Sequence, residues 1–270
     1  MLIDLKKVCE LMGVEFVVMG GSALGAIRHS GFIPWDDDVD VAMTRQAWSI
    51  FCDNFENSDL VEKYELDVIG FRDCDPKFVL PKLCLKDSTY VQLEEIGFPN
   101  HNNIYLDIFI IDNVSDNPVI RALDIFVSDN IRFISNSVGT YIYPNKYMNQ
   151  VMSSTWKTCV FYYIRLLQGC ICSIIPHKKW CEWFHLYVSR HNNKMTKLTT
   201  VAMGLKRYKG ETLEHEIWFP YSKGVFEGIA INLPHNVDKY LTCIYGDYMK
   251  LPPIEEREVH PIVKLKFPVE

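Results

Sequence analysis

The chain has 270 residues, 48% of them hydrophobic and 13% aromatic, and a formal net charge of −6. These values support a packed core and exclude an intrinsically disordered chain. Lys and Arg never run longer than two residues, which excludes the basic stripe of a nucleic-acid groove, so we expect no nucleic-acid partner. Nine cysteines without a regular spacing, and an N-terminus without a secretory signal, predict reduced thiols and a cytoplasmic location.

The N-terminal part of the chain predicts a helix followed by a strand–turn–helix–strand unit. Residues 2–12 carry apolar side chains at helical spacing, and residues 14–19 ("VEFVVM") are typical of a buried strand. A Gly-Gly turn follows, and Ser22 is predicted to be the N-cap of a short helix. Residues 38–43 ("DVDVAM") alternate charged and apolar side chains, which predicts a strand with one buried face, and Thr44 is predicted to cap the next helix.

The later part of the chain predicts more strands and then a mostly helical half. We expect strands at 64–71, 77–86 and 103–112. Long aromatic-rich helices are expected from 116 to Arg190, followed by a helix at 237–249 and a loop at 251–261. We therefore predict an α/β (α+β) fold, with a small mixed sheet and flanking helices in residues 1–115 and a mostly helical region in residues 116–270. No linker-like composition separates the two parts, so we expect one continuous domain.

The segment 159–175 ("CVFYYIRLLQGCICSII") is the most membrane-like part of the chain. It is short for a membrane span and is interrupted by Arg165 and Gln168, which argues against a transmembrane helix. We predict a buried helix here. A helix that lies against a membrane surface is the alternative.

One group of cysteines and a histidine could in principle hold zinc. The Cys-x-Cys spacing in this group is tighter than the pairing used by structural zinc sites, and the surroundings are aromatic and apolar. Buried, inert thiols are therefore the favoured interpretation. The residues concerned are Cys170, Cys172, Cys181 and His185.

The stretch "GGSALGAIRHSGFIPWDDDVDVAM", residues 20–43, places four carboxylates within five positions. Like charges at this density cost free energy unless a cation lies among them. On a strand, Asp38 and Asp40 project from the same face about 6.6 Å apart and could share Mg²⁺ or Mn²⁺. Asp36 has the same parity and is expected at the rim of the site, whereas Asp37 has the opposite parity and is expected to support the turn.

A third metal ligand is expected from the predicted strand at 103–112. Asp107 is isolated there among mostly apolar neighbours, and burying a carboxylate without a partner is costly. A metal ion would supply that partner. Because neighbouring strands lie about 4.8 Å apart, Asp107 could reach the same ion as Asp38 and Asp40.

The turn before the short helix has the chemistry to bind a phosphate. Gly20 and Gly21 would let a phosphate approach the backbone, and a helix that begins at Ser22 presents free N–H groups and the positive end of its dipole. Arg28 and His29 would add positive charge. A phosphate on one side and a metal on the other is the arrangement used for phosphoryl or nucleotidyl transfer.

Each of these features also has an ordinary structural interpretation. Gly-Gly turns before helices are common, an Asp-x-Asp pair is often a solvated strand edge, and a single Asp such as Asp107 can cap a turn. Their occurrence within one short unit and one later strand favours the metal site. The glycine motifs of P-loop and dinucleotide-binding folds are absent from the sequence.

The stretch at 20–43 resembles the signature of the LicD/fukutin family within the nucleotidyltransferase fold. The pattern of that fold is Gly-Gly or Gly-Ser, a spacer, Asp-apolar-Asp-apolar and a later Asp; it matches Gly20, Gly21, Ser22, Asp38, Asp40 and Asp107. "PKLCLKDSTY" resembles the family's lysine-containing strand, which would place Lys82 near the site. The segments "FEG" and "YLTCIYGDYMKLPP" are similar to its C-terminal region, and the resemblance is thin from about 116 to 200.

The resemblance implies a nucleotidyltransferase-like catalytic core in residues 1–115, completed as a substrate site by residues 116–270. It implies an Mg²⁺-dependent enzyme that takes CDP-choline, CDP-ribitol or CDP-glycerol. The enzyme would move the phospho-alcohol group, phosphocholine first among these, to a hydroxyl of a lipopolysaccharide, teichoic acid or capsule precursor and release CMP. A lipid-linked acceptor would place it at the inner face of the membrane, with peripheral membrane contact.

The resemblance and the residue chemistry assign provisional roles to the candidate residues. They are Asp38, Asp40 and Asp107 as metal ligands, Gly20, Gly21 and Ser22 as phosphate contacts, Arg28 and Lys82 as stabilisers of transition-state charge, and Asp107 or Asp36 as proton acceptor. Several outlying residues have equally good structural interpretations. These are Lys82 as a solvated strand residue, Asp247 as a turn or cap, Glu227 as a buried acid, and Arg257 and His260 as anchors of the tail.

Two other functions use the same residues. A nucleotidyltransferase would move NMP from an NTP to a small hydroxyl and expel pyrophosphate. A non-enzymatic module would bind nucleotide or metal without turnover. The presence of all three carboxylates favours an enzyme over the binding module.

Overall fold

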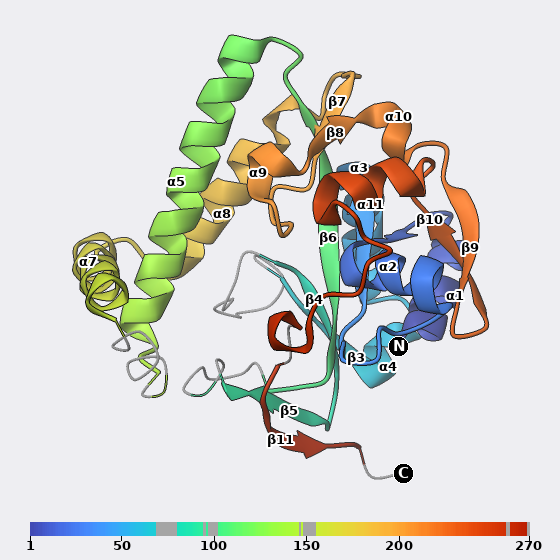
Figure 1. Cartoon of the computed structure of the whole chain (residues 1–270), viewed down its shortest axis with the longest axis horizontal. Coiled ribbons are helices and arrows are strands. Elements are labelled where there is room, and N and C mark those ends of the chain that lie inside the picture. Colours follow the sequence, from blue (N-terminus) through green and yellow to red (C-terminus); the bar gives the residue numbers. More distant parts are fainter. Residues whose placement is uncertain are drawn as a thin grey trace.

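A long central strand, β6, organises the sheet of this chain. The computed structural model describes residues 1–68, 80–93, 96, 102–145, 147, 155–257 and 260–268. Within them a seven-stranded mixed sheet has the order β1-β2-β6-β4-β3, and β7 and β8 extend it from the far end of β6 (Figure 1). The strands of this sheet are β1 (Val17–Val18), β2 (Asp40–Thr44), β3 (Tyr64–Asp67), β4 (Lys82–Leu85), β6 (Tyr105–Val114), β7 (Leu198–Thr200) and β8 (Thr212–Glu214).

Helices surround this sheet and account for most of the segment after β6. The α-helices are α1 (Leu2–Met12), α2 (Gly20–His29), α3 (Arg45–Phe55), α4 (Leu60–Lys63), α5 (Pro118–Ile142), α7 (Trp156–Cys172), α8 (His177–Val188), α9 (Arg207–Gly210), α10 (His215–Trp218) and α11 (Val237–Tyr245). The described residues also include two short 3-10 helices, η2 (Ser189–His191) and η3 (Ile254–Glu256). The predicted α+β fold class is confirmed, and the proposed boundary at residues 115 and 116 stays a prediction.

The pairing of β2 with β6 follows from their apolar composition and sets the register of the site. The two strands run parallel, with Asp40 opposite Asp107 and Val41 opposite Ile108. Val41 and Ile108 are fully buried, because parallel strands of this kind are covered on both faces. The predicted strand at 38–43 begins two residues late as an assigned element, although the carbonyl of Val39 already accepts a hydrogen bond from Asp107 N at 3.2 Å.

The helix boundaries near the acidic stretch were predicted with mixed success. The Thr44 side chain accepts a hydrogen bond from Ala47 N, so the predicted cap of α3 is confirmed. The predicted N-cap at Ser22 is wrong, because α2 begins at Gly20 and Met19 is its N-cap residue. The Ser22 hydroxyl instead accepts a hydrogen bond from the Asp40 backbone N–H at 2.9 Å, which ties the helix to β2.

The C-terminal part of the chain returns to the N-terminal half and packs against it. A hairpin of β9 (Ser222–Phe226) and β10 (Ile229–Leu233), which the sequence pattern did not assign, lies next to β1, and the Asn232 side chain donates a hydrogen bond to the Phe16 carbonyl. The last strand, β11 (Ile262–Lys266), was also not predicted; it pairs with β5 (Thr89–Gln92). Parts of the predicted strands at 64–71 and 77–86, namely residues 69–71 and 77–79, lie outside the described residues.

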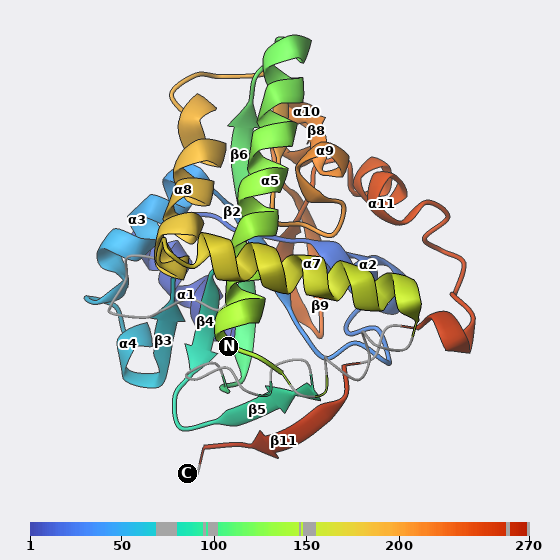
Figure 2. The same ribbon diagram turned by 90° about the vertical axis from the view of Figure 1, so that its left-hand side faces the viewer.

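The helix α7 crosses the outside of α5, as Figure 2 shows most clearly. Most of its residues are exposed or half-buried, and Tyr162 and Gly169 are its buried ones, so the predicted buried helix is wrong for most of this segment. Among the described residues, no single helix has the length and apolar character of a membrane span. Helix α7 and the following segment His177–His191 meet that criterion as a pair, with a bend of 95° between them.

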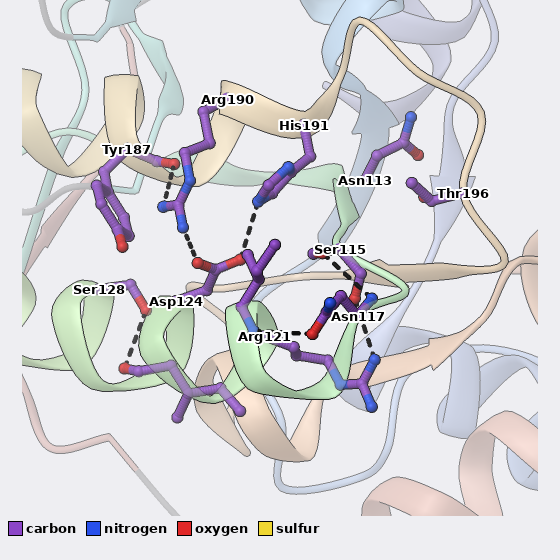
Figure 3. A network of polar contacts seen from close by, with 12 residues as sticks. Asn113, Ser115, Asn117, Arg121, Asp124, Ser128, Tyr187, Arg190, His191 and Thr196 are labelled. Atoms are coloured by element: carbon purple, nitrogen blue, oxygen red, sulfur yellow. Dashed lines mark hydrogen bonds and ion pairs between the residues drawn. The ribbon is translucent and has the colours of Figure 1, made fainter.

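A buried carboxylate joins α5 to the end of α8. Asp124 is fully buried on α5 and forms an ion pair with Arg190 and a contact of 2.9 Å from its Oδ2 to His191 Nε2 (Figure 3). The Arg190 guanidinium also stacks on the Tyr187 ring, 3.7 Å from its centroid. Burial and the neighbouring Arg190 lower the pKa of His191, so the neutral imidazole can donate its Nε2 hydrogen to Asp124.

We predict that Asp124→Ala lowers the free energy of unfolding by about 1.5–3 kcal/mol, the usual contribution of hydrogen bonds to a charged group. The variant would leave Arg190 without its carboxylate partner. Urea denaturation followed by circular dichroism measures the change. Asp53→Ala, which removes an exposed carboxylate on α3, is the control and should leave the midpoint unchanged. Equal midpoints for Asp124→Ala and the wild type would contradict a structural role for the network.

Candidate active site

Three carboxylates lie together where the loop before β2 joins that strand. Asp40 begins β2, Asp107 lies opposite it on β6, and Asp38 precedes Asp40 by two residues. One oxygen from each carboxylate lies within 4.8 Å of the others. The predicted grouping of these residues, including the isolated Asp107, is therefore what the structure contains.

The N-terminus of α2 lies directly against these acidic side chains. Gly20 has a φ of +57°, in the left-handed region that glycine tolerates best. A Cβ atom at Gly20 would lie 2.7 Å from Asp40 Oδ2, and one at Gly21 would lie 2.7 Å from Asp36 Oδ2. Both glycines are therefore required by the close approach of carboxylates to the first turn of the helix, where the helix dipole favours negative charge.

Two hydrogen bonds hold this first turn in place. Gly20 N donates to the Tyr240 hydroxyl at 3.0 Å, and Asp40 N donates to the Ser22 hydroxyl at 2.9 Å. Tyr240 belongs to α11 and is completely buried, so the C-terminal part of the chain determines where the turn lies. Ser22 is also buried and does not line the cleft described below, and its predicted contact with a phosphate stays a prediction.

Burial and mutual repulsion make the carboxylates hard to ionise together. Burial is the main cause that raises the pKa of Asp38 to about 7, and Asp36 and Asp107 raise it further. The same two causes, burial first and then the neighbouring carboxylates, raise the pKa of Asp40 well above its ordinary value. The pKa of Asp36 is also raised, again mainly by burial. Such a cluster is stable in its charged form only with a cation among its oxygens.

Lys82 supplies one positive charge from the neighbouring strand β4. Its Nζ lies 2.8 Å from Asp107 Oδ1 and 3.1 Å from the centroid of the Tyr105 ring. The side chain is buried, so the alternative of a solvated strand residue is wrong. Because Lys82 contacts Asp107 and does not line the cleft, its predicted role in stabilising the transition state stays a prediction.

The donor set fits a hard divalent cation. Carboxylate oxygens are the ligands preferred by Mg²⁺, which holds them at about 2.1 Å, so oxygens on opposite sides of one ion lie about 4 Å apart. Asp38, Asp40 and Asp107 offer oxygens at comparable separations. These three residues could therefore hold the ion with small movements of their side chains.

A cleft of ≈ 480 Å³ opens beside the carboxylates. Sequence-predicted residues that line it are Gly20, Gly21, Arg28, Asp36, Asp38, Asp40, Asp107, Asp247, Arg257 and His260. Several of the cleft residues that the sequence did not suggest come from the C-terminal part, among them Glu211, Tyr240, Tyr245 and Lys250. Glu227 lies away from this lining, and its Oε1 accepts a hydrogen bond from Phe32 N at 3.0 Å.

Basic side chains reach the cleft from α2 and from the tail. Arg28 Nη1 donates to the Tyr248 carbonyl at 2.7 Å. Burial lowers the pKa of Arg28, but a guanidinium keeps its charge in proteins. The Arg257 guanidinium lies 4.1 Å from the centroid of the Trp35 ring, a cation–π contact. These contacts hold two positive charges on the walls of a cleft that is also lined by seven carboxylates.

Asp37 has a structural role, as its parity predicted. Its two carboxylate oxygens contact the Tyr90 hydroxyl at 2.5 Å and His260 Nδ1 at 3.0 Å. Tyr90 lies on β5, which pairs with the terminal strand β11, so Asp37 connects the acidic loop to the C-terminal tail. His260 thereby acts as an anchor of the tail as well as a residue of the cleft wall.

Glu211 is the site residue that is hardest to foresee from the sequence. It follows α9, is 1% exposed, and its Oε1 accepts a hydrogen bond from Lys206 N at 3.1 Å. Its Oε2 has no hydrogen-bond partner among the described residues, and burial raises the pKa of this carboxyl to about 7. Gly204 leaves the space that the carboxylate fills, since a Cβ there would lie 2.5 Å from Glu211 Oε1.

The alternative zinc site has a different arrangement from the one a metal needs. Cys181 is buried and contacts the Ser135 hydroxyl, whereas Cys170 is exposed on α7. In the portion of the chain that the structure describes, the aspartate triad is the one group of acidic, His or Cys side chains spaced to hold a metal ion. The prediction of buried thiols is confirmed for Cys181 and is wrong for Cys170, which is exposed, and for Cys172, which is half-buried.

Comparison with known proteins identifies relatives of the chain. Residues 13–138 match the family model described as LicD/FKTN/FKRP, nucleotidyltransferase domain. The chain is also 25% identical, over 282 aligned residues, to the lipopolysaccharide cholinephosphotransferase LicD of Haemophilus influenzae. That alignment covers 94% of this chain and 89% of the relative. The matched residues contain the glycine turn and all three carboxylates of the triad.

We predict that Asp38→Asn is more stable than the wild type when divalent cations are removed at pH 7.5. A carboxyl whose pKa is raised by folding stabilises the protein below its unfolded pKa, and this contribution is lost as the pH rises through about 7. The variant has no carboxyl to ionise at this position, so it does not lose stability in this pH range. We therefore expect its melting temperature to be higher than that of the wild type by about 2–4 °C, the shift produced by about 1 kcal/mol. Thermal unfolding in EDTA between pH 4 and pH 8 measures it.

Addition of Mg²⁺ should raise the melting temperature of the wild type and leave that of Asp38→Asn nearly unchanged. Asp53→Asn serves as the matched control, because its exposed carboxylate is remote from the triad in sequence and lies on α3. An Asp38→Asn variant that melts below the wild type in EDTA would show that the carboxylate is needed for folding, contrary to the repulsion described above.

Proposed function

Because the chain belongs to the LicD family, we propose that it is a transferase that moves phosphocholine from a CDP-activated donor to a hydroxyl of a cell-surface glycan and releases CMP. The relative from Haemophilus influenzae is named for cholinephosphate transfer with lipopolysaccharide. CDP-choline is the proposed donor, and a lipopolysaccharide, teichoic acid or capsule precursor is the proposed acceptor. CDP-ribitol and CDP-glycerol are the other donors that the family resemblance suggests.

The observation that carries this proposal is the contact between the carboxylate triad and the first turn of α2. A donor pyrophosphate needs positive charge on one side and N–H donors on the other. The triad can hold a divalent cation, and the amides of Gly21 and Ser22 in the first turn of α2 have no acceptors within the helix. The Gly20 amide already donates to the Tyr240 hydroxyl. Arg28 and Arg257 add fixed positive charge on the same cleft.

In the proposed mechanism, Asp38, Asp40 and Asp107 would hold Mg²⁺ or Mn²⁺. The bound ion would supply positive charge that offsets the negative charge of the pyrophosphate. Gly20 and Gly21 allow the donor's phosphate oxygens to approach the backbone of the α2 turn. Lys82 orients Asp107 through its contact of 2.8 Å.

The acceptor hydroxyl oxygen would attack the phosphorus that carries the choline. The bond from that phosphorus to the bridging oxygen breaks, and CMP departs with the electron pair. Asp36 is the proposed acceptor of the hydroxyl proton, since it lines the cleft and burial raises its pKa toward the working pH. Asp107, the other candidate, is already paired with Lys82.

Glu211 and its neighbours support choline as the cargo over ribitol or glycerol. A quaternary ammonium is bound best by aromatic rings together with a desolvated negative charge. Glu211 and the rings of Phe109, Tyr240 and Tyr245 line one cleft, and Glu211 Oε2 has no hydrogen-bond partner within the described chain. A bound cation would compensate the cost of burying this carboxylate and lower its pKa.

We place the reaction in the cytoplasm at the inner face of the membrane. The reason is the acceptor class: glycan precursors of the cell surface are commonly joined to lipid, and the relative acts on lipopolysaccharide according to its name. A cytidine-activated donor is water-soluble, so the enzyme would take one substrate from solution and the other from the membrane.

The first test is a product assay on purified protein with Mg²⁺ and separate donors: CDP-choline, CDP-ribitol, CDP-glycerol, CTP and ATP. We expect CMP from CDP-choline, with loss of the product in EDTA and a fall in rate of about 10³-fold or more in Asp40→Asn, because a metal ligand is removed. Asp53→Asn should retain the wild-type rate. Pyrophosphate released from a triphosphate would establish a nucleotidyltransferase instead. If the protein binds metal and nucleotide but forms no product even with acceptor extract present, the result would support a non-enzymatic binding module.

The second test concerns the cargo. We predict that Glu211→Gln raises the KM for CDP-choline about 10-fold, the loss expected for one cation contact of about 1.4 kcal/mol, and leaves the KM for CDP-glycerol unchanged. Glu227→Gln is the matched control, because Glu227 lies outside the cleft lining. Equal effects of Glu211→Gln on both donors would assign Glu211 to the structure of the cleft and not to the cargo.

A further inference from the structure

The polarity of α7 is opposite to that of a helix on the surface of a water-soluble domain. Such a helix normally turns its apolar side chains inward and its polar ones to solvent. In α7 and the turn that follows, the exposed large apolar side chains are Trp156 (73% exposed), Val160, Phe161, Tyr163, Ile164, Leu167, Ile171 and Ile174 (87% exposed). Lys157 is the exposed charged residue of this helix.

Apart from Lys157, the long polar side chains of α7 face the protein. The Arg165 guanidinium donates to the Asn136 carbonyl at 3.2 Å and to the Thr140 hydroxyl at 2.9 Å, both on α5. Gln168 Oε1 accepts a hydrogen bond from the Ser137 hydroxyl at 3.0 Å. The side of α7 that carries these polar groups is therefore the side that contacts α5.

Close packing through small residues reinforces this arrangement. Gly169 is buried where α7 crosses α5, and a Cβ at this position would clash with the carbonyl oxygen of Ser137. Small residues and polar side chains at a helix–helix contact, with apolar side chains turned away from it, are typical of helices packed in lipid. The same pattern is unfavourable for a helix surrounded by water, because large apolar side chains remain hydrated.

The exposed side chains form one stripe along the helix. Val160, Ile164, Leu167, Ile171 and Ile174 follow each other at intervals of three or four residues, so they lie on one face of α7. In Figure 2 this helix lies across the outside of the molecule over α5. We name the stripe, with Trp156 and Phe161 beside it, the α7 face.

The charges around the α7 face favour an anionic surface. Although the whole chain has a net charge of −6, residues 156–191 contain five Lys and Arg residues and one acidic residue, Glu182. Two of the five, Arg165 and Arg190, are paired within the protein, and Lys179 forms an ion pair with Glu182 on the surface. Lys157 lies at one end of the α7 face, and Lys178 and Lys179 lie just beyond the other. Basic residues that flank an apolar stripe, with Trp and Tyr among the apolar side chains, characterise helices at the boundary of lipid headgroups and acyl chains.

The length of α7 decides between spanning a membrane and lying on it. Its 17 residues rise about 25 Å, less than the hydrocarbon thickness of about 30 Å, and Arg165 and Gln168 interrupt any apolar run along the helix axis. The next helix continues at 95°. A helix parallel to the membrane surface accommodates both facts, because it buries one face and leaves the polar face on the protein.

We propose that the α7 face docks the protein on an anionic lipid bilayer, with α7 parallel to the membrane surface and its apolar stripe inserted below the headgroups. The polar face of α7 remains paired with α5, so docking requires no rearrangement of the fold. The surface consists of α7 residues alone. Its link to the proposed function is that it would keep the protein at the membrane that carries a lipid-linked acceptor.

Flotation with vesicles tests this proposal without any substrate. The full chain is mixed with vesicles of phosphatidylethanolamine and phosphatidylglycerol in equal parts, and the fraction that floats is measured. We expect the wild type to float and the double variant Leu167→Glu, Ile171→Glu to lose at least about 10-fold in affinity, because two charges enter the stripe. Leu11→Glu, which replaces an equally exposed leucine on α1 (74% exposed), should float like the wild type.

Two further measurements complete the test. Thermal unfolding should show that both variants fold like the wild type, and vesicles of phosphatidylcholine alone should bind less protein because the anionic lipid is absent. A wild type that fails to float, or a double variant that floats equally well, would overturn the proposal. So would a wild-type dimer in sedimentation that the double variant breaks, since the partner would then be a second copy of the chain. Because no donor or acceptor is present, failure of the proposed reaction leaves this result unaffected.

Discussion

Repulsion among buried carboxylates is the constraint on which the rest of the site depends. Asp36, Asp38, Asp40 and Asp107 come together because β2 and β6 pair in parallel with Asp40 opposite Asp107. The positive end of the α2 helix dipole and the ammonium group of Lys82 reduce this repulsion. The carboxylates can approach the helix because Gly20 and Gly21 have no side chains. A site of this kind stores unfavourable electrostatic energy that a bound cation can relieve.

The C-terminal part of the chain completes what the matched N-terminal part begins. The family model ends at residue 138, yet Glu211, Tyr240 and Arg257 line the cleft beside the carboxylates. These residues surround the triad with aromatic rings and one further buried acid. The carboxylates proposed to hold a metal ion thus lie in the matched segment, whereas most of the residues proposed to select the cargo lie after it.

The sequence was most informative where a residue conflicts with its neighbours. Asp107 could be predicted because a carboxylate amid apolar strand residues needs a partner, and Asp38 and Asp40 because their alternation places both on one face. Glu211 and Tyr240 could not be predicted as site residues, because they reach the site through contacts between residues far apart in the chain, such as Gly20 and Tyr240. The N-cap prediction for Ser22 was wrong because the local sequence favours a serine cap, whereas in the fold the Ser22 hydroxyl accepts a hydrogen bond from Asp40 N.

The hydrogen bond from Gly20 to Tyr240 also has a consequence for the order of events during synthesis. The two residues are 220 positions apart, so the glycine turn and the acidic loop leave the ribosome long before the helix that positions them. Until α11 docks, the turn lacks the partner of its first amide. The nascent N-terminal half therefore carries the reactive residues without the contacts that organise them, and transfer can begin only when nearly the whole chain has been made.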